Sequence, residues 1–147
     1  MIRLNLPRYS FRIKSKENKL YIFDRNRKKQ VLLTEEEWVR QHFIEYLVQG
    51  KKYPRSLIAI EKQCKVEETI KRTDILVFNK NGQAEIIVEC KAPSVRIDQD
   101  VFDQIARYNL KLKANYLVVT NGLEHFFCQM DHQEQKYHFL PDIPLYV

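Results

Sequence analysis

Residues 72–93 read RTDILVFNKNGQAEIIVECKAP, and they predict a two-stranded hairpin with charged groups beside an apolar core. Strands are expected over residues 73–78 and 84–91, where β-branched and other apolar side chains dominate. Between them, Asn81-Gly82 is the strongest short hairpin signal. The two strands are therefore expected to run antiparallel and side by side.

The second strand of this hairpin separates its charged side chains from most of its apolar ones. Every second residue of a strand shares a face. One face is expected to hold Glu85, Ile87, Glu89 and Lys91. Asp74 lies on the preceding strand, so the turn brings it back beside Glu89 and Lys91. These charges are costly to bury without partners. An ordinary salt bridge at a half-exposed strand is the alternative interpretation.

Two carboxylates and a lysine at one sheet edge are the groups that metal-assisted phosphodiester hydrolysis requires. Asp74 and Glu89 supply hard oxygen ligands for Mg²⁺, with Mn²⁺ as a substitute, and the backbone carbonyl of Cys90 adds a further oxygen. Lys91 would hold or deprotonate the attacking water, because the pKa of a lysine responds to burial.

The rest of the chain predicts an α/β fold with a mixed sheet and an N-terminal β-hairpin. The hairpin is expected over residues 9–14 and 19–24. Thr34 and Glu37 form a capping box, which starts a helix that runs to about residue 49. A second helix is expected over residues 99–113, and further strands over residues 57–63, 116–120, 126–130 and 137–140.

Length and composition indicate one globular domain, residues 1–147, with a basic hairpin region at 1–33 and a core at 34–130. No apolar run is long enough for a bilayer and no secretory signal is evident, so a cytoplasmic protein without membrane contact is expected. Three cysteines without a CxxC pair predict reduced thiols: Cys64, Cys90 and Cys128. The four histidines lack ligand spacing.

Positive charge is concentrated at the N-terminal end. Residues 1–30 hold ten Lys or Arg and two acids, whereas the whole chain carries +6, so residues 31–147 carry −2. A cationic cluster can bind a phosphate backbone through counterion release. The residues predicted to do so are Arg25, Arg27, Lys28 and Lys29. The alternative is a solvated turn that only keeps the protein soluble.

Three motifs resemble those of the PD-(D/E)xK nuclease superfamily: Arg72-Thr73-Asp74-Ile75, Glu89-Cys90-Lys91-Ala92-Pro93 and Gln104-Ile105-Ala106-Arg107-Tyr108. The nearest resemblance is to the N-terminal nuclease domain of type I restriction enzyme R subunits, over about residues 20–130. Thr73 stands where the motif has its proline. The resemblance implies a restriction-endonuclease-like mixed β-sheet flanked by helices.

The resemblance also assigns roles to residues. It implies that Asp74 and Glu89 are metal ligands and that Lys91 is the catalytic lysine. Gln104 and Tyr108 match the Q-x-x-x-Y motif that supports the site and contacts DNA, with an ordinary half-buried helix pair as the alternative. Glu37 matches the acidic residue that the first helix often directs at the metal, although its capping role competes with this one.

These patterns favour a Mg²⁺-dependent DNA endonuclease or nuclease subunit of the restriction or defence type. The alternative is a non-cleaving nucleic-acid-binding or assembly module that keeps the nuclease fold and docks on a translocase partner. The family's domain is fused to an ATP-driven translocase, but this chain has no GxxxxGK[ST] loop. DNA is the expected partner. Three alternatives stay open: the domain works alone, it acts with a separate helicase, translocase or specificity subunit, or it keeps the fold for another use.

Overall fold

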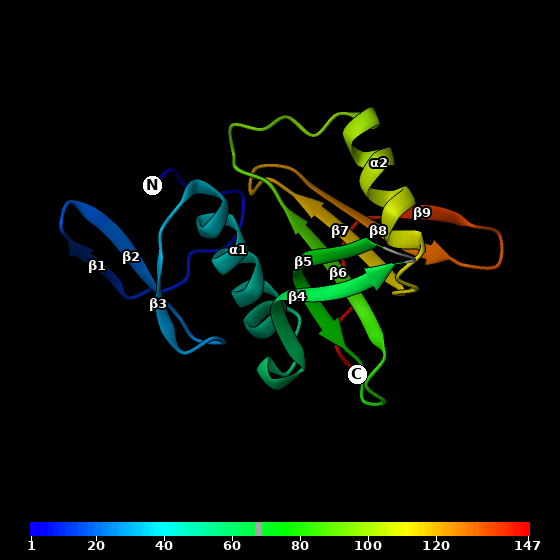
Figure 1. Ribbon diagram of the computed structural model, residues 1–147, viewed down its shortest axis with the longest axis horizontal. Coiled ribbons are helices and arrows are strands. Elements are labelled where there is room, and N and C mark those ends of the chain that lie inside the picture. The colour runs from blue at the N-terminus through cyan, green and yellow to red at the C-terminus, as the bar shows by residue number, and fades with distance from the viewer. Residues whose placement is uncertain (67–68) are drawn as a thin grey trace.

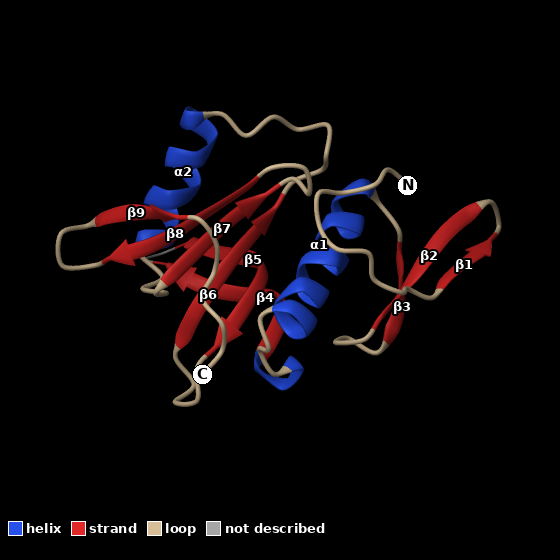
Figure 2. Cartoon of the chain, turned by 180° about the vertical axis from the view of Figure 1, so that it is seen from behind, coloured by secondary structure: helices blue, strands red, loops and turns tan. Residues whose placement is uncertain are grey.

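The computed structural model describes the backbone of residues 1–66 and 69–147, and it does not describe the side chains of residues 64–71. A three-stranded antiparallel sheet and a six-stranded mixed sheet lie on either side of helix α1 (Figures 1 and 2). A second helix, α2, packs on the larger sheet. The mixed α/β fold with an N-terminal hairpin is confirmed.

The small sheet consists of β1 (Ile13–Lys16), β2 (Lys19–Asp24) and β3 (Lys29–Leu32). Glu17 and Asn18 connect β1 to β2 with positive φ angles of 52° and 64°, as a two-residue hairpin turn requires. The first strand begins at Ile13, later than the predicted residue 9. The preceding segment packs its aromatic rings on α1 instead, with the Phe11 ring 4.8 Å from that of His42.

Helix α1 spans Glu35–Glu45 and carries the residues that join the two sheets. The hydroxyl of Thr34 accepts a hydrogen bond of 3.0 Å from the N–H of Glu37, so the predicted N-cap is confirmed. The helix continues as a π-helical turn over Tyr46–Gly50. A short 3₁₀ turn, Arg55–Leu57, then leads into the large sheet.

The large sheet has the order β4-β5-β6-β7-β8-β9, in which β6 and β7 pair in parallel and the other neighbours pair antiparallel. A parallel connection needs a crossover, which is provided by α2 (Gln99–Leu110), capped by Asp98. The strands are β4 (Ile58–Val66), β5 (Thr69–Phe78), β6 (Ala84–Cys90), β7 (Tyr116–Thr120), β8 (His125–Asp131) and β9 (Lys136–Leu140).

Each face of the large sheet packs against one helix. Val88 belongs to the core cluster that includes Phe43 of α1, whereas Ile87 belongs to the cluster that includes Phe102 and Ala106 of α2. The predicted alternation along β6 is therefore confirmed, and Glu89 shares the α2 face with Ile87. The core extends beyond residue 130, because Ile143 is fully buried in the α1 cluster.

Among the described side chains, Cys90 and Cys128 are buried free thiols, and Cys64 lies outside them. Burial raises the pKa of Cys128 to about 12, so this thiol stays protonated at neutral pH. No helix in the described residues combines the length and the apolar character needed to cross a membrane.

Candidate active site

Asp74 and Glu89 are held next to each other on adjacent strands. Ile75 of β5 pairs with Val88 of β6. The next position along both strands sets Asp74 across from Glu89. Asp74 Oδ2 accepts a hydrogen bond of 2.7 Å from the backbone N–H of Cys90, which fixes this carboxylate at the end of β6. Asp74 is half-buried and Glu89 is buried.

Lys91 directly follows β6 and is half-buried. Its backbone N–H donates a hydrogen bond of 2.8 Å to the carbonyl of Thr120, so the end of β7 holds the main chain in place. The positive charge of Lys91 acts to lower the pKa of Glu36 on α1. The predicted lysine therefore lies where α1 meets the carboxylate-bearing end of the sheet.

Glu36 is an acidic residue of this site that sequence reasoning missed. It is half-buried in the first turn of α1, and its pKa is raised above the usual range. Burial is the largest cause and the negative charge of Asp74 is the next, against the opposing charges of Arg40 and Lys91. The sequence signal was present in the i, i+4 spacing of Glu36 and Arg40, which places both on one face of the helix.

Glu37, which the family resemblance offered as a metal ligand in competition with its capping role, has its carboxylate engaged by Arg27, Arg40 and Gln41. Its side chain is 7% exposed, and it accepts hydrogen bonds from Arg27 at 3.0 Å and from Gln41 at 3.0 Å. Arg40 adds a two-point contact, with Nε at 3.1 Å and Nη2 at 3.2 Å. A metal ion at Glu37 would have to displace these donors.

Arg40 connects Glu37 to the candidate site. Its side chain is 8% exposed, and Nη1 lies 3.9 Å from Asp74 Oδ1, too far for a hydrogen bond. Nη2 forms an ion pair of 3.2 Å with Glu61 Oε1. This buried guanidinium therefore places one positive charge between three carboxylates.

Glu61 is a second acid that sequence reasoning missed. The register between β4 and β5 sets it across from Asp74, because Ile60 pairs with Ile75 and Lys62 pairs with Thr73. Glu61 has a φ of 55°, a left-handed conformation that costs energy inside a strand. Glu61, Asp74 and Glu89 thus occupy one cross-strand row on three neighbouring strands.

Arg27, which was predicted to contact DNA, is used within the protein. It is half-buried, and its Nε donates to Asp24 Oδ2 at 2.6 Å. The same guanidinium contacts Glu37 and lies 3.8 Å from Glu61. Arg27 therefore fastens the β2–β3 turn to α1 and β4.

The other three members of the cationic turn differ in their exposure. Arg25 donates to Glu45 at 3.3 Å and to the carbonyl of Ser10 at 3.0 Å, with 42% of its side chain exposed. Lys28 and Lys29 are exposed. The charge available to an outside ligand at this turn is thus smaller than the sequence suggests.

Gln104 and Tyr108 lie on α2, which covers the same face of the sheet as Glu89. Gln104 is exposed and Tyr108 is half-buried. The two residues are one helical turn apart, as the Q-x-x-x-Y spacing requires. A role in supporting the site stays a prediction for this pair.

The donor set fits a hard divalent cation, although it is not a preformed metal cage. Within the described residues, no group of three or more His, Cys, Asp or Glu side chains is arranged to hold a metal ion. Asp74, Glu89 and Glu36 offer carboxylate oxygens, which Mg²⁺ prefers. Burial and, next, the charge of Asp74 raise the pKa of Glu36, and a bound cation would relieve the repulsion between the two carboxylates.

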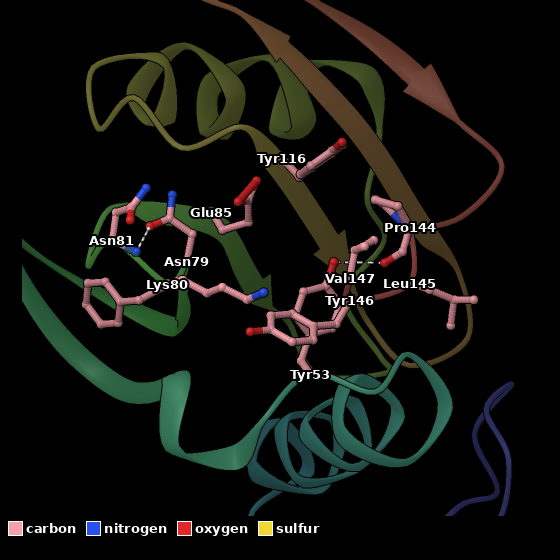
Figure 3. A pocket seen from close by; sticks show the side chains of 11 residues that line it. Tyr53, Asn79, Lys80, Asn81, Glu85, Tyr116, Pro144, Leu145, Tyr146 and Val147 are labelled. Carbon is pink, nitrogen blue, oxygen red and sulfur yellow. Dashed lines mark hydrogen bonds between the residues drawn. The ribbon is translucent and has the colours of Figure 1, made fainter.

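A separate cavity of about 400 Å³ opens at the other end of the large sheet (Figure 3). Tyr53, Tyr116 and Tyr146 line it, and Lys80 Nζ lies 5.7 Å from the centre of the Tyr146 ring. Burial, and secondarily Glu85, raises the pKa of Tyr53 to about 12. The cavity lies at the β5–β6 turn, whereas Asp74 lies mid-strand in β5 and Glu89 near the other end of β6, so the cavity is distinct from the candidate site.

The chain is a mixed α/β domain whose large sheet carries Asp74, Glu89 and Lys91 at adjoining strand positions. The family model of the type I restriction enzyme R protein N terminus matches residues 35–144. The chain belongs to this family. Among curated proteins, none matches the chain.

Proposed function

We propose that this restriction-type domain cleaves DNA by Mg²⁺-dependent hydrolysis of phosphodiester bonds. The observation that carries the proposal is the hydrogen bond between Asp74 Oδ2 and the N–H of Cys90, together with the cross-strand position of Glu89. This arrangement keeps two carboxylates together at the end of β6, beside Lys91. Family membership supports a nuclease role.

In this proposal, Asp74 and Glu89 hold Mg²⁺ or Mn²⁺, and the carbonyl of Cys90 provides a third oxygen. When bound there, the ion would supply positive charge that stabilises the negative charge developing on the scissile phosphate. Lys91 orients the attacking water, and its amine would accept the proton of that water when the amine is neutral. The remaining motif residues, Gln104 and Tyr108, support the site and contact DNA.

Glu36, rather than Glu37, is the helix carboxylate that we assign to this centre. Burial and, next, the negative charge of Asp74 raise the pKa of Glu36, so a cation beside these two carboxylates would be favoured. The carboxylate of Glu37 is already used by Arg27, Arg40 and Gln41. The sequence-based assignment of Glu37 is replaced for this reason.

Nicking of supercoiled plasmid across a Mg²⁺ titration tests the proposal. Lys91→Ala should reduce the rate by about 100-fold or more at every Mg²⁺ concentration, because positioned proton transfer contributes about that much. Asp74→Asn should also stop cleavage, but high Mg²⁺ or Mn²⁺ should partly restore it, since the loss is one of metal affinity.

A matched control is Glu134→Gln, which removes an exposed acid between β8 and β9 and should leave nicking unchanged. Both site variants should keep the folded circular dichroism spectrum of the wild type. Nicking that survives both Lys91→Ala and Asp74→Asn would overturn the assignment of the site.

A non-cleaving module that docks on a translocase is the second candidate function. The observation that favours it is the Arg40 guanidinium, 3.9 Å from Asp74, which already supplies a positive charge to the carboxylates. An inert wild type with no Mn²⁺ binding by calorimetry would select this function. An inert wild type that binds Mn²⁺ would instead indicate that cleavage requires a separate motor or specificity subunit.

A further inference from the structure

The outward face of the three-stranded sheet combines basic and aromatic side chains. In the β1–β2 register, Lys14 pairs with Tyr21 and Lys16 with Lys19, so these four side chains share one face. The β2–β3 register adds Gln30, opposite Phe23, and Leu32, opposite Tyr21. The lysines, Gln30 and Leu32 are exposed, whereas the two aromatic residues are half-buried.

The opposite face of this sheet is turned toward the rest of the molecule. Ile22 and Asp24 alternate with the outward residues of β2, and both are 0% exposed. Asp24 accepts a hydrogen bond of 2.9 Å from Gln41 of α1. The outward face therefore remains the side available to a ligand, on the far side of the sheet from α1.

A cavity of about 270 Å³ lies on this outward face. It is lined by Lys14, Lys16, Glu17, Tyr21 and Gln30. Beside it, the guanidinium of Arg12 lies 4.2 Å from the centre of the Phe23 ring, so the second aromatic residue is stacked with a cation. The ring of Tyr21 remains as the aromatic surface inside the cavity.

Positive charge predominates on this face. No described residue forms an ion pair with Lys14, Lys16 or Lys19, although Arg25 and Arg27 of the adjacent turn are both paired. Glu17 is the acid at the cavity, against three lysines of the same sheet face. The exposed ammonium groups fit the phosphates of a nucleic-acid strand.

We infer that the outward face of β1–β3 binds single-stranded nucleic acid, with a base stacked on Tyr21 and the backbone held by Lys14, Lys16 and Lys19. A base can stack on a side chain only when it is unpaired, whereas duplex bases are stacked on one another. This inference rests on the proposed nucleic-acid function. It places the nucleic-acid contact on the sheet face beside the predicted cationic turn, and not on the turn itself.

Binding of a fluorescein-labelled oligo(dT) to the full chain, measured by anisotropy in EDTA, tests the inference. Tyr21→Ala should weaken binding about 10-fold, within the range that loss of one stacked base gives, and Tyr21→Phe should retain binding because it keeps the ring. Lys14→Gln with Lys16→Gln should reduce the salt slope of log K by about 1.4, at about 0.7 per phosphate contact.

Lys136→Gln, an exposed lysine of β9, is the matched charge control and should leave both slope and affinity nearly unchanged. Equal weakening by Tyr21→Ala and Tyr21→Phe, or equal affinity for a blunt duplex and oligo(dT), would overturn the stacked single strand. Unchanged affinity in all of these variants would also overturn the inference. EDTA removes the metal that the proposed cleavage requires, so this assay measures binding alone. A failure of binding can therefore be distinguished from a failure of cleavage.

Discussion

Adjacent residues in α1 have opposite surroundings, and this difference decides their roles. Successive side chains on a helix point about 100° apart. Glu36 is turned toward Asp74 and Lys91, whereas Glu37 is turned toward Arg27 and Arg40. Glu36 is repelled by Asp74, whereas Glu37 accepts hydrogen bonds from several donors. The first suits a cation site and the second suits a structural junction.

Substituting each acid by glutamine should therefore give two different phenotypes. Glu36→Gln should raise the Mg²⁺ concentration for half-maximal nicking several-fold, while urea unfolding shows unchanged or slightly higher stability, because repulsion from Asp74 is removed. Glu37→Gln should cost about 3 kcal/mol of unfolding free energy, since it leaves the buried Arg40 charge without its two-point partner.

The two measurements separate the two roles. Nicking of Glu37→Gln should need the same Mg²⁺ concentration as the wild type at a temperature where the variant is folded. If Glu36→Gln destabilises the fold and leaves the Mg²⁺ requirement unchanged, the helix carboxylate does not belong to the metal centre.

At the scale of elements, periodicity and turn signals predicted most of the fold correctly. Tyr116–Thr120 forms β7 with the predicted bounds, and the Asn81-Gly82 turn joins two antiparallel strands. Local pattern also predicted that Asp74 lies beside Glu89. These features depend on neighbouring residues or on one short turn, so the sequence determines them directly.

Features that depend on contacts between residues far apart in the sequence were not predicted. Glu61, Asp74 and Glu89 form a row only because of the register between β4 and β5. The sequence of residues 64–71 contains no tight-turn signal from which this register could be predicted. The pairing of Arg27 with Glu37 likewise requires the three-stranded sheet to be placed against α1. A cationic sequence cluster reports charge, but only packing decides how much of that charge is neutralised.

The β7–β8 turn is an element whose tightness can be tested. Gly122 has a φ of 85°, and a Cβ there would lie 2.7 Å from Leu4 Cδ2 and 3.0 Å from Val39 Cγ2. Gly122→Ala should therefore cost about 2–4 kcal/mol in urea unfolding, from left-handed strain together with overpacking. The expected cause is displacement of the N-terminal segment, which Asn5 fastens to the Gly122 carbonyl.

Gly82→Ala is the matched comparison, because Gly82 has a φ of 76° and a methyl group there would meet no atom within 4 Å. It should cost about 1–2 kcal/mol from backbone strain alone. Equal losses of stability in the two variants would show that the side chains of Leu4 and Val39 move aside without lowering the free energy of unfolding.

At the scale of the whole molecule, one ion-pair network joins the small sheet to the candidate site. It runs from Asp24 through Arg27 to Glu37 and Glu61, and from these acids through Arg40 to Asp74. The small sheet is therefore attached by charged groups in addition to apolar contacts. Its attachment should respond to pH in a way that an apolar interface would not.

Asp24 is the member of this network with which the pH response can be tested. Its pKa is lowered despite full burial, because hydrogen bonds from Arg27 and Gln41 outweigh desolvation. A lowered folded pKa means that the unfolded chain binds the proton first as pH falls. Stability from Asp24 is thus complete above its unfolded pKa of about 4 and is lost as pH falls through the lower folded pKa.

Asp24→Asn should cost about 2 kcal/mol or more at pH 7, through lost charge-assisted hydrogen bonds, and should flatten the fall in stability below about pH 4. Limited proteolysis should then cleave residues 1–33 faster in the variant. Asp142→Asn is the control, since Asp142 also has a lowered pKa but holds Tyr46 and Lys51. Asp142→Asn should flatten the fall in stability at low pH without faster proteolysis of residues 1–33. Equal proteolytic cleavage of both variants would contradict a charge-based attachment of the small sheet.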